Sequence, residues 1–215
     1  RPSLVCLCSA AALGCDCFFH VPLAACPPVL FARSSNARTP RRRRDGAPPP
    51  RGFRAPVFSL TAATAWAHRV LADEGFSYSS SVLPAKNPLF GWPEFGPTPR
   101  VVDGVRELPI TLGRVCGRDL PIFGGTYFRV MPYLLIRSRL QAALAAGPVI
   151  TYFHPYDIDA AQPWVIHAGV RGNRILNALL FLRRRSLPGR LQAYLAASPK
   201  GLTFSAFLAQ VQAST

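Results

Sequence analysis

The sequence Val149-Ile150-Thr151-Tyr152-Phe153-His154-Pro155-Tyr156-Asp157-Ile158-Asp159 decides the class of fold. Its first five residues form an apolar run of strand length, and a histidine and a proline end that run. A run without polar alternation is typical of a strand covered on both faces, as in a parallel sheet. His154 would therefore stand at the carboxyl end of a buried strand, where α/β proteins place their functional sites.

Helices and strands alternate on both sides of this segment. Pro132 is expected to open a helix that runs to Ala146, because Gly147-Pro148 follows as a stop signal. Thr61 is expected to cap a helix over 62–73, and Gly75 lies where a helix C-cap belongs. Strands are predicted over 53–58, 76–78 and 105–111, a turn at Gly124-Gly125, and further helices over 175–185, 190–197 and 205–212. This alternation predicts an α/β fold, a parallel layer structure or a barrel.

Composition divides the chain into an irregular first part and an orderly remainder. Residues 1–51 hold five of the six cysteines and the run Arg41-Arg42-Arg43-Arg44, and no helical or strand period persists there. We therefore predict no regular structure in 1–51, and we regard much of it as GC-rich DNA read out of frame. The first residue is Arg1 and the only methionine is Met131, which favours a fragment of a longer protein.

The overall composition excludes some classes of protein. The 215 residues are 49% apolar and 11% aromatic, which excludes a wholly disordered chain. The formal net charge of +15 is almost all arginine, but no aromatic or glycine residues interleave the arginine run, so no specific nucleic-acid site is predicted. The apolar run near the start is too short and broken to span a membrane. The cysteine pairs Cys6-x-Cys8 and Cys15-x-Cys17 lack the spacing of zinc knuckles and ribbons.

Four phrases, in order, resemble the later motifs of the polysaccharide deacetylase (NodB-like) family, in its exopolysaccharide-associated branch with an extra C-terminal region. In that branch the phrases run close to GFRAPxFS, EGFxYDSSVxP, GGxYFR and YFHPWExD. In this chain they are Gly52-Phe53-Arg54-Ala55-Pro56-Val57-Phe58-Ser59, Glu74-Gly75-Phe76-Ser77-Tyr78-Ser79-Ser80-Ser81-Val82-Leu83-Pro84, Gly124-Gly125-Thr126-Tyr127-Phe128-Arg129, and Tyr152-Phe153-His154-Pro155-Tyr156-Asp157-Ile158-Asp159. The resemblance implies an incomplete (β/α) barrel, with residues 52–160 as the C-terminal part of the deacetylase domain and 161–215 as the helical C-terminal region.

The resemblance also implies an activity, metal-dependent hydrolysis of N-acetyl groups on a carbohydrate polymer in bacterial polysaccharide metabolism. In that family a divalent metal, usually zinc, polarises the acetyl carbonyl and activates water. His154 matches the general acid that protonates the departing amine, and Arg54 matches the arginine that orients a catalytic aspartate. The substrate-binding positions implied are Tyr78, Ser79, Ser80, Tyr127 and Tyr156. The implied partner is an N-acetylated polysaccharide or oligosaccharide.

The chain departs from the family pattern at the metal site. The family's acidic first motif and its H-x-x-x-H phrase lie upstream of the Arg-Ala-Pro phrase, and neither is present; no two of the four histidines are four residues apart. Ser79 stands where the family has aspartate, and Asp157 where glutamate is usual. We therefore expect no metal site in this chain, and no activity from the chain alone.

Two other functions stay open on sequence. A basic, non-catalytic binder of acidic polysaccharide or nucleic acid would need arginines grouped on one stable face. A peripheral membrane protein would use the basic amphipathic helices predicted over 175–185 and 190–197. The compartment, cytoplasm or cell envelope of a bacterium, is also left open.

Overall fold

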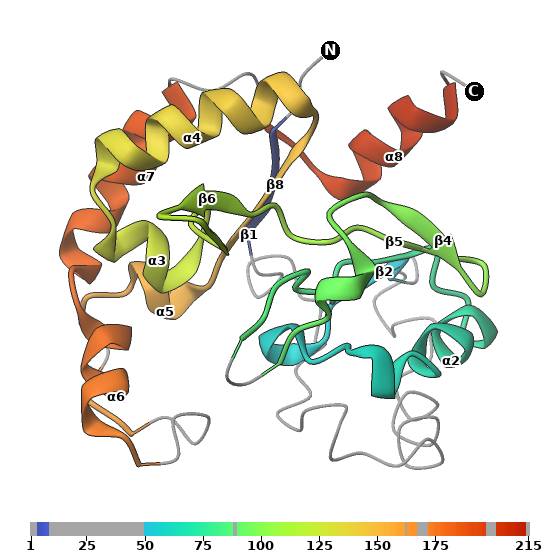
Figure 1. The fold of residues 1–215 in the computed structure, drawn as a ribbon, viewed down its shortest axis with the longest axis horizontal. Coiled ribbons are helices and arrows are strands. Elements are labelled where there is room, and N and C mark those ends of the chain that lie inside the picture. Colours follow the sequence, from blue (N-terminus) through green and yellow to red (C-terminus); the bar gives the residue numbers. More distant parts are fainter. Residues whose placement is uncertain are drawn as a thin grey trace, which may run out of the picture. The chain divides into compact units, whose positions relative to one another are not determined.

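The structure is a computed structural model, and it describes residues 4–8, 50–87, 90–161, 163–166, 172–196 and 201–213. It is a mixed α/β fold with parallel strands (Figure 1). The chain forms two compact units, one from residues 15–110 and one from residues 1–14 together with 111–215. These two units differ from the three domains expected from the sequence, 1–51, 52–160 and 161–215. The three domain boundaries stay predictions. The two units are described in turn.

A small sheet organises the unit of residues 15–110. Its strands are β2 (Gly52–Phe53), β3 (Tyr78–Ser79), β5 (Val105–Glu107) and β4 (Arg100–Val102), in the order β2-β3-β5-β4. The first three are mutually parallel, and β4 pairs antiparallel with β5. Of the strand predicted over 76–78 only Tyr78 belongs to β3, and the strand predicted over 105–111 is present as β5 but ends at Glu107.

The segment between β2 and β3 corrects the expectation of a strand over 53–58. Only the end at Phe53 is a strand, and Pro56–Phe58 is a 3-10 helix (η3). Proline has no N–H for a strand ladder and its fixed φ suits the first position of a helix. The predicted helix over 62–73 is divided into a 3-10 turn, η4 (Ala62–Thr64), and α2 (Ala67–Asp73). Gly75 has φ +82° just after α2, as expected of a helix end.

The core of this unit lies between α2 and the sheet. Leu71 of α2, Val105 of β5 and Phe53 of β2 are buried together with Leu60 and Val82. A further 3-10 turn, η5 (Pro93–Phe95), adds the ring of Phe95 to this core. The apolar side chains of several short elements thus form one hydrophobic cluster.

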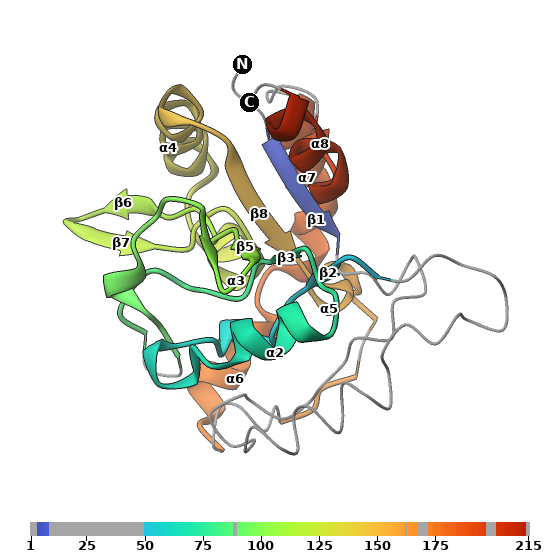
Figure 2. The ribbon, with the colours of Figure 1, turned by 90° about the vertical axis from the view of Figure 1, so that its right-hand side faces the viewer.

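The second unit contains the strand from which the sequence analysis began. Strand β8 (Val149–Phe153) is buried at all five positions, which confirms the prediction of a strand covered on both faces. It pairs in parallel with β1 (Leu4–Cys8), and β1 pairs in parallel with β9 (Gly201–Leu202). Figures 1 and 2 both show β8 and β1 side by side. The strand β1 contradicts the expectation of no regular structure in 1–51, because the apolar run Leu4–Cys8 finds a parallel partner distant in sequence.

Helices and one hairpin complete this unit. The hairpin joins β6 (Gly113–Val115) to β7 (Arg118–Leu120). The helical segments are α3 (Gly125–Val130), α4 (Tyr133–Ala146), α5 (Pro155–Ile158), α6 (Arg174–Phe181), the 3-10 turn η7 (Arg184–Ser186), α7 (Leu187–Ala196) and α8 (Phe204–Ala213). Among the residues that the structure describes, none of the helices has both the length and the apolar character needed to cross a bilayer.

In this unit one turn prediction and one helix prediction need correction, and one helix prediction is confirmed. Pro132 and Gly147 delimit α4 as expected. Gly124-Gly125 is not an isolated turn, because Gly125 begins the helix α3. The single helix expected over 175–185 ends at Phe181, since Arg183 adopts a left-handed conformation with φ +56° and the chain restarts as η7.

Aromatic rings connect the helices to β8 in the core of this unit. The ring of Phe128 on α3 lies 5.1 Å, centroid to centroid, from Phe153 of β8 and 5.1 Å from Tyr194 of α7. Both pairs are edge-to-face, which is a favoured geometry for aromatic rings. The helix that begins at Gly125 is therefore packed directly on the strand that precedes His154.

Candidate functional site

His154 follows β8 at the start of a short, closed turn. Its backbone N–H donates to Asp157 Oδ2 over 3.0 Å, and the Asp157 N–H donates to the His154 carbonyl over 2.9 Å. The two bonds close the turn on which α5 begins. His154 is half-buried while Asp157 is fully buried. The buried carboxylate thus fixes the backbone from which the His154 imidazole projects.

A buried ion pair ties this turn to α3. Arg129 Nη2 lies 3.1 Å from Asp157 Oδ1, and both side chains are 0% exposed. The pair is an ion pair by distance, since the contact at Oδ1 falls outside hydrogen-bond geometry. Removing two charges from water is costly, so such a pair needs further polar contacts to persist.

Arg129 has those further contacts. Its Nη1 donates to the Leu182 carbonyl over 2.8 Å, and its Nη2 donates to the Leu180 carbonyl and to Thr126 Oγ1, each over 3.0 Å. One guanidinium therefore joins α3, α5 and the end of α6. In the sequence, Arg129 belongs to a motif phrase but carries no predicted role. An arginine in an otherwise apolar helical stretch was the signal, because a buried arginine requires a buried partner.

The two glycines of the same phrase bring α3 against β8. A Cβ added to Gly124 would lie 2.0 Å from the Tyr152 carbonyl oxygen, and one added to Gly125 would lie 2.8 Å from the Tyr152 ring. Gly124 and Tyr152 also form a parallel bridge. The phrases Gly124–Arg129 and Tyr152–Asp157 are thus in contact at both ends, through backbone at the glycines and through charge at Arg129.

The aromatic residues predicted to bind substrate in this unit have different surroundings. Tyr127 is half-buried on α3 and packs partly against the core. Tyr156 belongs to α5, but its side chain lies outside the described residues. Their roles in binding sugar stay predictions.

Arg54, in the other unit, bridges the ends of β2 and β3. Its Nε donates to the Ser80 carbonyl over 2.9 Å and its Nη2 donates to Ser80 Oγ over 2.8 Å. Ser80 Oγ in turn donates to the Leu108 carbonyl over 2.7 Å. The guanidinium also lies over the Phe58 ring, 5.0 Å from its centroid. Arg54 and Ser80 are therefore brought together, and the role of Arg54 toward a catalytic aspartate stays a prediction.

Ser79, Ser80 and Ser81 are buried and their hydroxyls are engaged within the protein. Ser79 Oγ donates to Ser81 Oγ over 2.8 Å, and Ser81 Oγ accepts the Ala55 N–H over 2.8 Å. Tyr78 is half-buried, and its ring fills the space above Gly52, where a Cβ would lie 2.1 Å from Tyr78 Cζ. The three predicted positions Tyr78, Ser79 and Ser80 support the shape of the loop, and contact with substrate stays a prediction.

Glu107 organises this loop from the next strand. Its Oε1 accepts the backbone N–H groups of Ser81 and Val82 over 2.6 and 3.0 Å, and its Oε2 lies 3.2 Å from His68 Nε2. Glu107 and His68 are both fully buried. Neither residue was singled out from the sequence. The histidine on the predicted helix over 62–73 was the one available signal, since a buried imidazole needs a polar partner.

The described residues do not fit a catalytic zinc. Such a site needs three protein ligands around one position. In the described ranges, no group of three His, Cys, Asp or Glu side chains could hold a metal ion. Cys15, Cys17, Cys26, His20 and His167 lie outside the described residues.

Comparison with known proteins identifies one family. Residues 80–199, more than half of the chain, match the domain of unknown function DUF3473. The chain belongs to this family, whose domain is associated with polysaccharide deacetylase family proteins. No curated protein and no solved structure gives a significant match.

Proposed function

We propose that the protein acts in bacterial polysaccharide metabolism as a polysaccharide deacetylase-like protein that binds an N-acetylated carbohydrate polymer. The family domain at residues 80–199 supports this proposal, because it is associated with polysaccharide deacetylases. The observation that carries it is the buried Arg129–Asp157 ion pair, which joins two of the four motif phrases. Asp157 of this pair also accepts the backbone N–H of His154 and so holds the backbone of that residue in place. The ion pair gives a structural reason for the two phrases that contain Arg129 and Asp157 to occur in the same chain.

His154 is the residue to which we assign chemistry. Hydrolysis of an N-acetyl group adds water across the amide, breaks the C–N bond, and leaves acetate and a free amine. The departing nitrogen must gain a proton, and an imidazole at a strand end is suited to supply it near neutral pH. Asp157 would act on this step as a positioning residue, because it holds the His154 backbone rather than the ring.

Arg54 is proposed to position a partner carboxylate. Its guanidinium is anchored on Ser80 at both Nε and Nη2 and lies over the Phe58 ring, and these contacts set its orientation. A pre-oriented guanidinium loses less entropy when it binds a carboxylate.

The chain alone is proposed to bind substrate without cleaving it. The described side chains do not fit zinc, and the sequence has no H-x-x-x-H phrase. We therefore assign no step to a metal.

Incubation with tetra-N-acetylated glucosamine oligomers, with and without added zinc, tests this proposal. Acetate release and saturation-transfer NMR would be followed on the same sample, with the fully deacetylated oligomer as control. We expect saturation transfer to the acetyl methyl groups and no acetate above the protein-free blank. Absence of binding to the acetylated oligomer would contradict the substrate class, and steady zinc-dependent acetate release would contradict the inactivity of the chain alone.

A further inference from the structure

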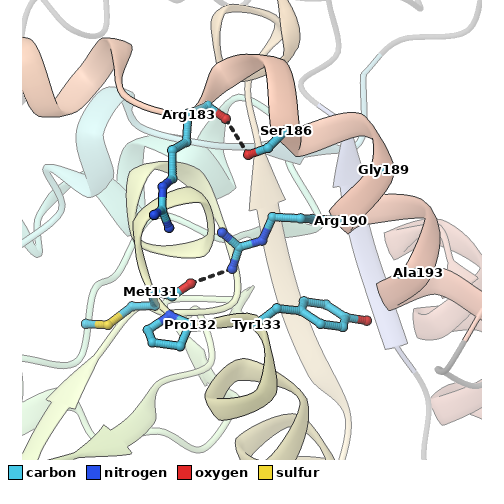
Figure 3. Close-up of a pocket in the computed structure, with 8 residues that line it drawn as sticks. All are labelled: Met131, Pro132, Tyr133, Arg183, Ser186, Gly189, Arg190 and Ala193. Atoms are coloured by element: carbon cyan, nitrogen blue, oxygen red, sulfur yellow. Dashed lines mark hydrogen bonds between the residues drawn. The ribbon is translucent and has the colours of Figure 1, made fainter.

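An open cavity of about 480 Å³ lies in the second unit. None of its lining residues belongs to the four motif phrases, although Met131 follows the phrase that ends at Arg129 by two residues. One wall is the segment that joins α3 to α4, and the other is η7 with the first turns of α7. Figure 3 labels the residues that line it, which are Met131, Pro132, Tyr133, Arg183, Ser186, Gly189, Arg190 and Ala193.

Two guanidinium groups enter this cavity from the same wall. Figure 3 shows Arg183 and Arg190 extending toward the segment Met131–Tyr133. Arg190 donates to the backbone carbonyls of Arg129 and Met131, so its charge is held in place. Burial lowers the pKa of Arg190 from its ordinary value, and the like charge of Arg183 lowers it further. The two cations are therefore close enough to repel each other.

The carboxylates that could balance these charges are used elsewhere. None of the described lining residues is acidic. In the described part of this unit, Asp157 is paired with Arg129, Asp119 with Arg114, and Asp159 accepts the Ala161 N–H. Two cations on one wall, with no acidic side chain among the described residues that line the cavity, indicate a place for an anion.

The backbone around Arg183 is shaped to present this side chain. Arg183 has φ +56°, in the left-handed region that residues with a Cβ rarely adopt, and Ser186 Oγ donates to its carbonyl over 2.8 Å. The structure gives the Arg183 guanidinium no hydrogen bond or ion pair with another described residue. A strained backbone that directs an unengaged cation into a cavity is a feature of binding sites.

We propose that this cavity binds the carboxylate of a sugar acid, as found along an acidic polysaccharide. Arg183 would contact the carboxylate directly and Arg190 would supply a fixed positive charge. Pro132 and the ring of Tyr133 offer apolar surface to one face of a sugar ring, which an inorganic anion would not use. The inference does not rest on deacetylation, since it concerns a different ligand group and different residues.

Titrations with D-glucuronate, D-glucose and inorganic phosphate, followed by 15N NMR at low salt, test the proposal. We expect glucuronate to shift signals of the cavity residues with at least tenfold higher affinity than glucose or phosphate. Arg183→Gln should weaken glucuronate about tenfold or more, in line with the loss of one charged hydrogen bond. Arg139→Gln, which removes an exposed charge on α4 outside the cavity, should change the affinity less than twofold.

Arg183→Lys keeps the charge and loses the planar fork, so its affinity should fall between the parent and Arg183→Gln. Melting temperatures of all three variants should equal that of the parent, because Arg183 and Arg139 are exposed. Phosphate bound as tightly as glucuronate would overturn the sugar-acid assignment. Equal weakening by Arg183→Gln and Arg139→Gln would overturn the site itself.

Discussion

Replacing Asp157 with asparagine removes one charge from a fully buried pair and keeps the shape of the side chain. The asparagine oxygen can still accept the His154 N–H, which Asp157 Oδ2 accepts over 3.0 Å. Arg129 then stays buried without its counter-charge, and loss of one partner of a buried pair costs about 3–5 kcal/mol. Arg129 keeps two carbonyls and one hydroxyl as acceptors. We therefore expect Asp157→Asn to lower the free energy of unfolding by about 3 kcal/mol, the lower end of this range.

Thermal unfolding followed by circular dichroism measures this loss. For a chain of this size, about 3 kcal/mol corresponds to a fall in Tm of roughly 6–12 °C. Asp119→Asn is the matched control, because Asp119 pairs with Arg114 at 3.4 Å while both side chains are more than half exposed. That variant should lose less than about 1 kcal/mol. Equal small losses in both variants would refute the reasoning that the Arg129–Asp157 pair fixes the turn at His154.

Two further changes test the packing of the motif phrases. Glu107→Gln should lower the free energy of unfolding by about 2–3 kcal/mol, because a neutral amide oxygen accepts the Ser81 and Val82 N–H groups more weakly than the carboxylate oxygen of Glu107 does. Urea titration measures this loss, and an unchanged midpoint would contradict it. Gly124→Ala should cost about 3 kcal/mol or more, since its Cβ would lie 2.0 Å from the Tyr152 carbonyl oxygen. Gly189→Ala, with nothing within 4 Å of its Cβ inside α7, should be stabilising by about 0.5–1 kcal/mol. Equal midpoints for the two glycine variants would contradict the close approach of Gly124 to β8.

Much of the fold follows from local signals in the sequence. The strand at 149–153 was predicted from its unbroken apolar run. The helix between Pro132 and Gly147 was predicted from the proline before it and the glycine after it, which are both local signals. The break at Arg183 was missed, since nothing in the local sequence marks a non-glycine residue for positive φ. The strand Leu4–Cys8 was missed because its pairing with β8 joins residues more than 140 positions apart.

The candidate site was predicted less completely than the fold. The motif phrases contained His154, Arg54 and Arg129, but only contacts across the fold show what each one touches. Asp157 was noted as a replacement for glutamate, and the structure shows it in a buried ion pair. Glu107 was not noticed at all, because a single glutamate at a strand end carries no pattern that distinguishes it from an exposed one.

The response of the His154 imidazole to an N-acetylated sugar tests the central proposal most directly. Ring nitrogen and proton signals of His154 would be recorded by NMR as tetra-N-acetylated glucosamine oligomer is added. His68 is the internal reference, because it is buried against Glu107. We expect the His154 signals to move in a saturable way and the His68 signals to stay in place, with no response to the deacetylated oligomer. An unchanged His154 at saturating oligomer would contradict the proposed function.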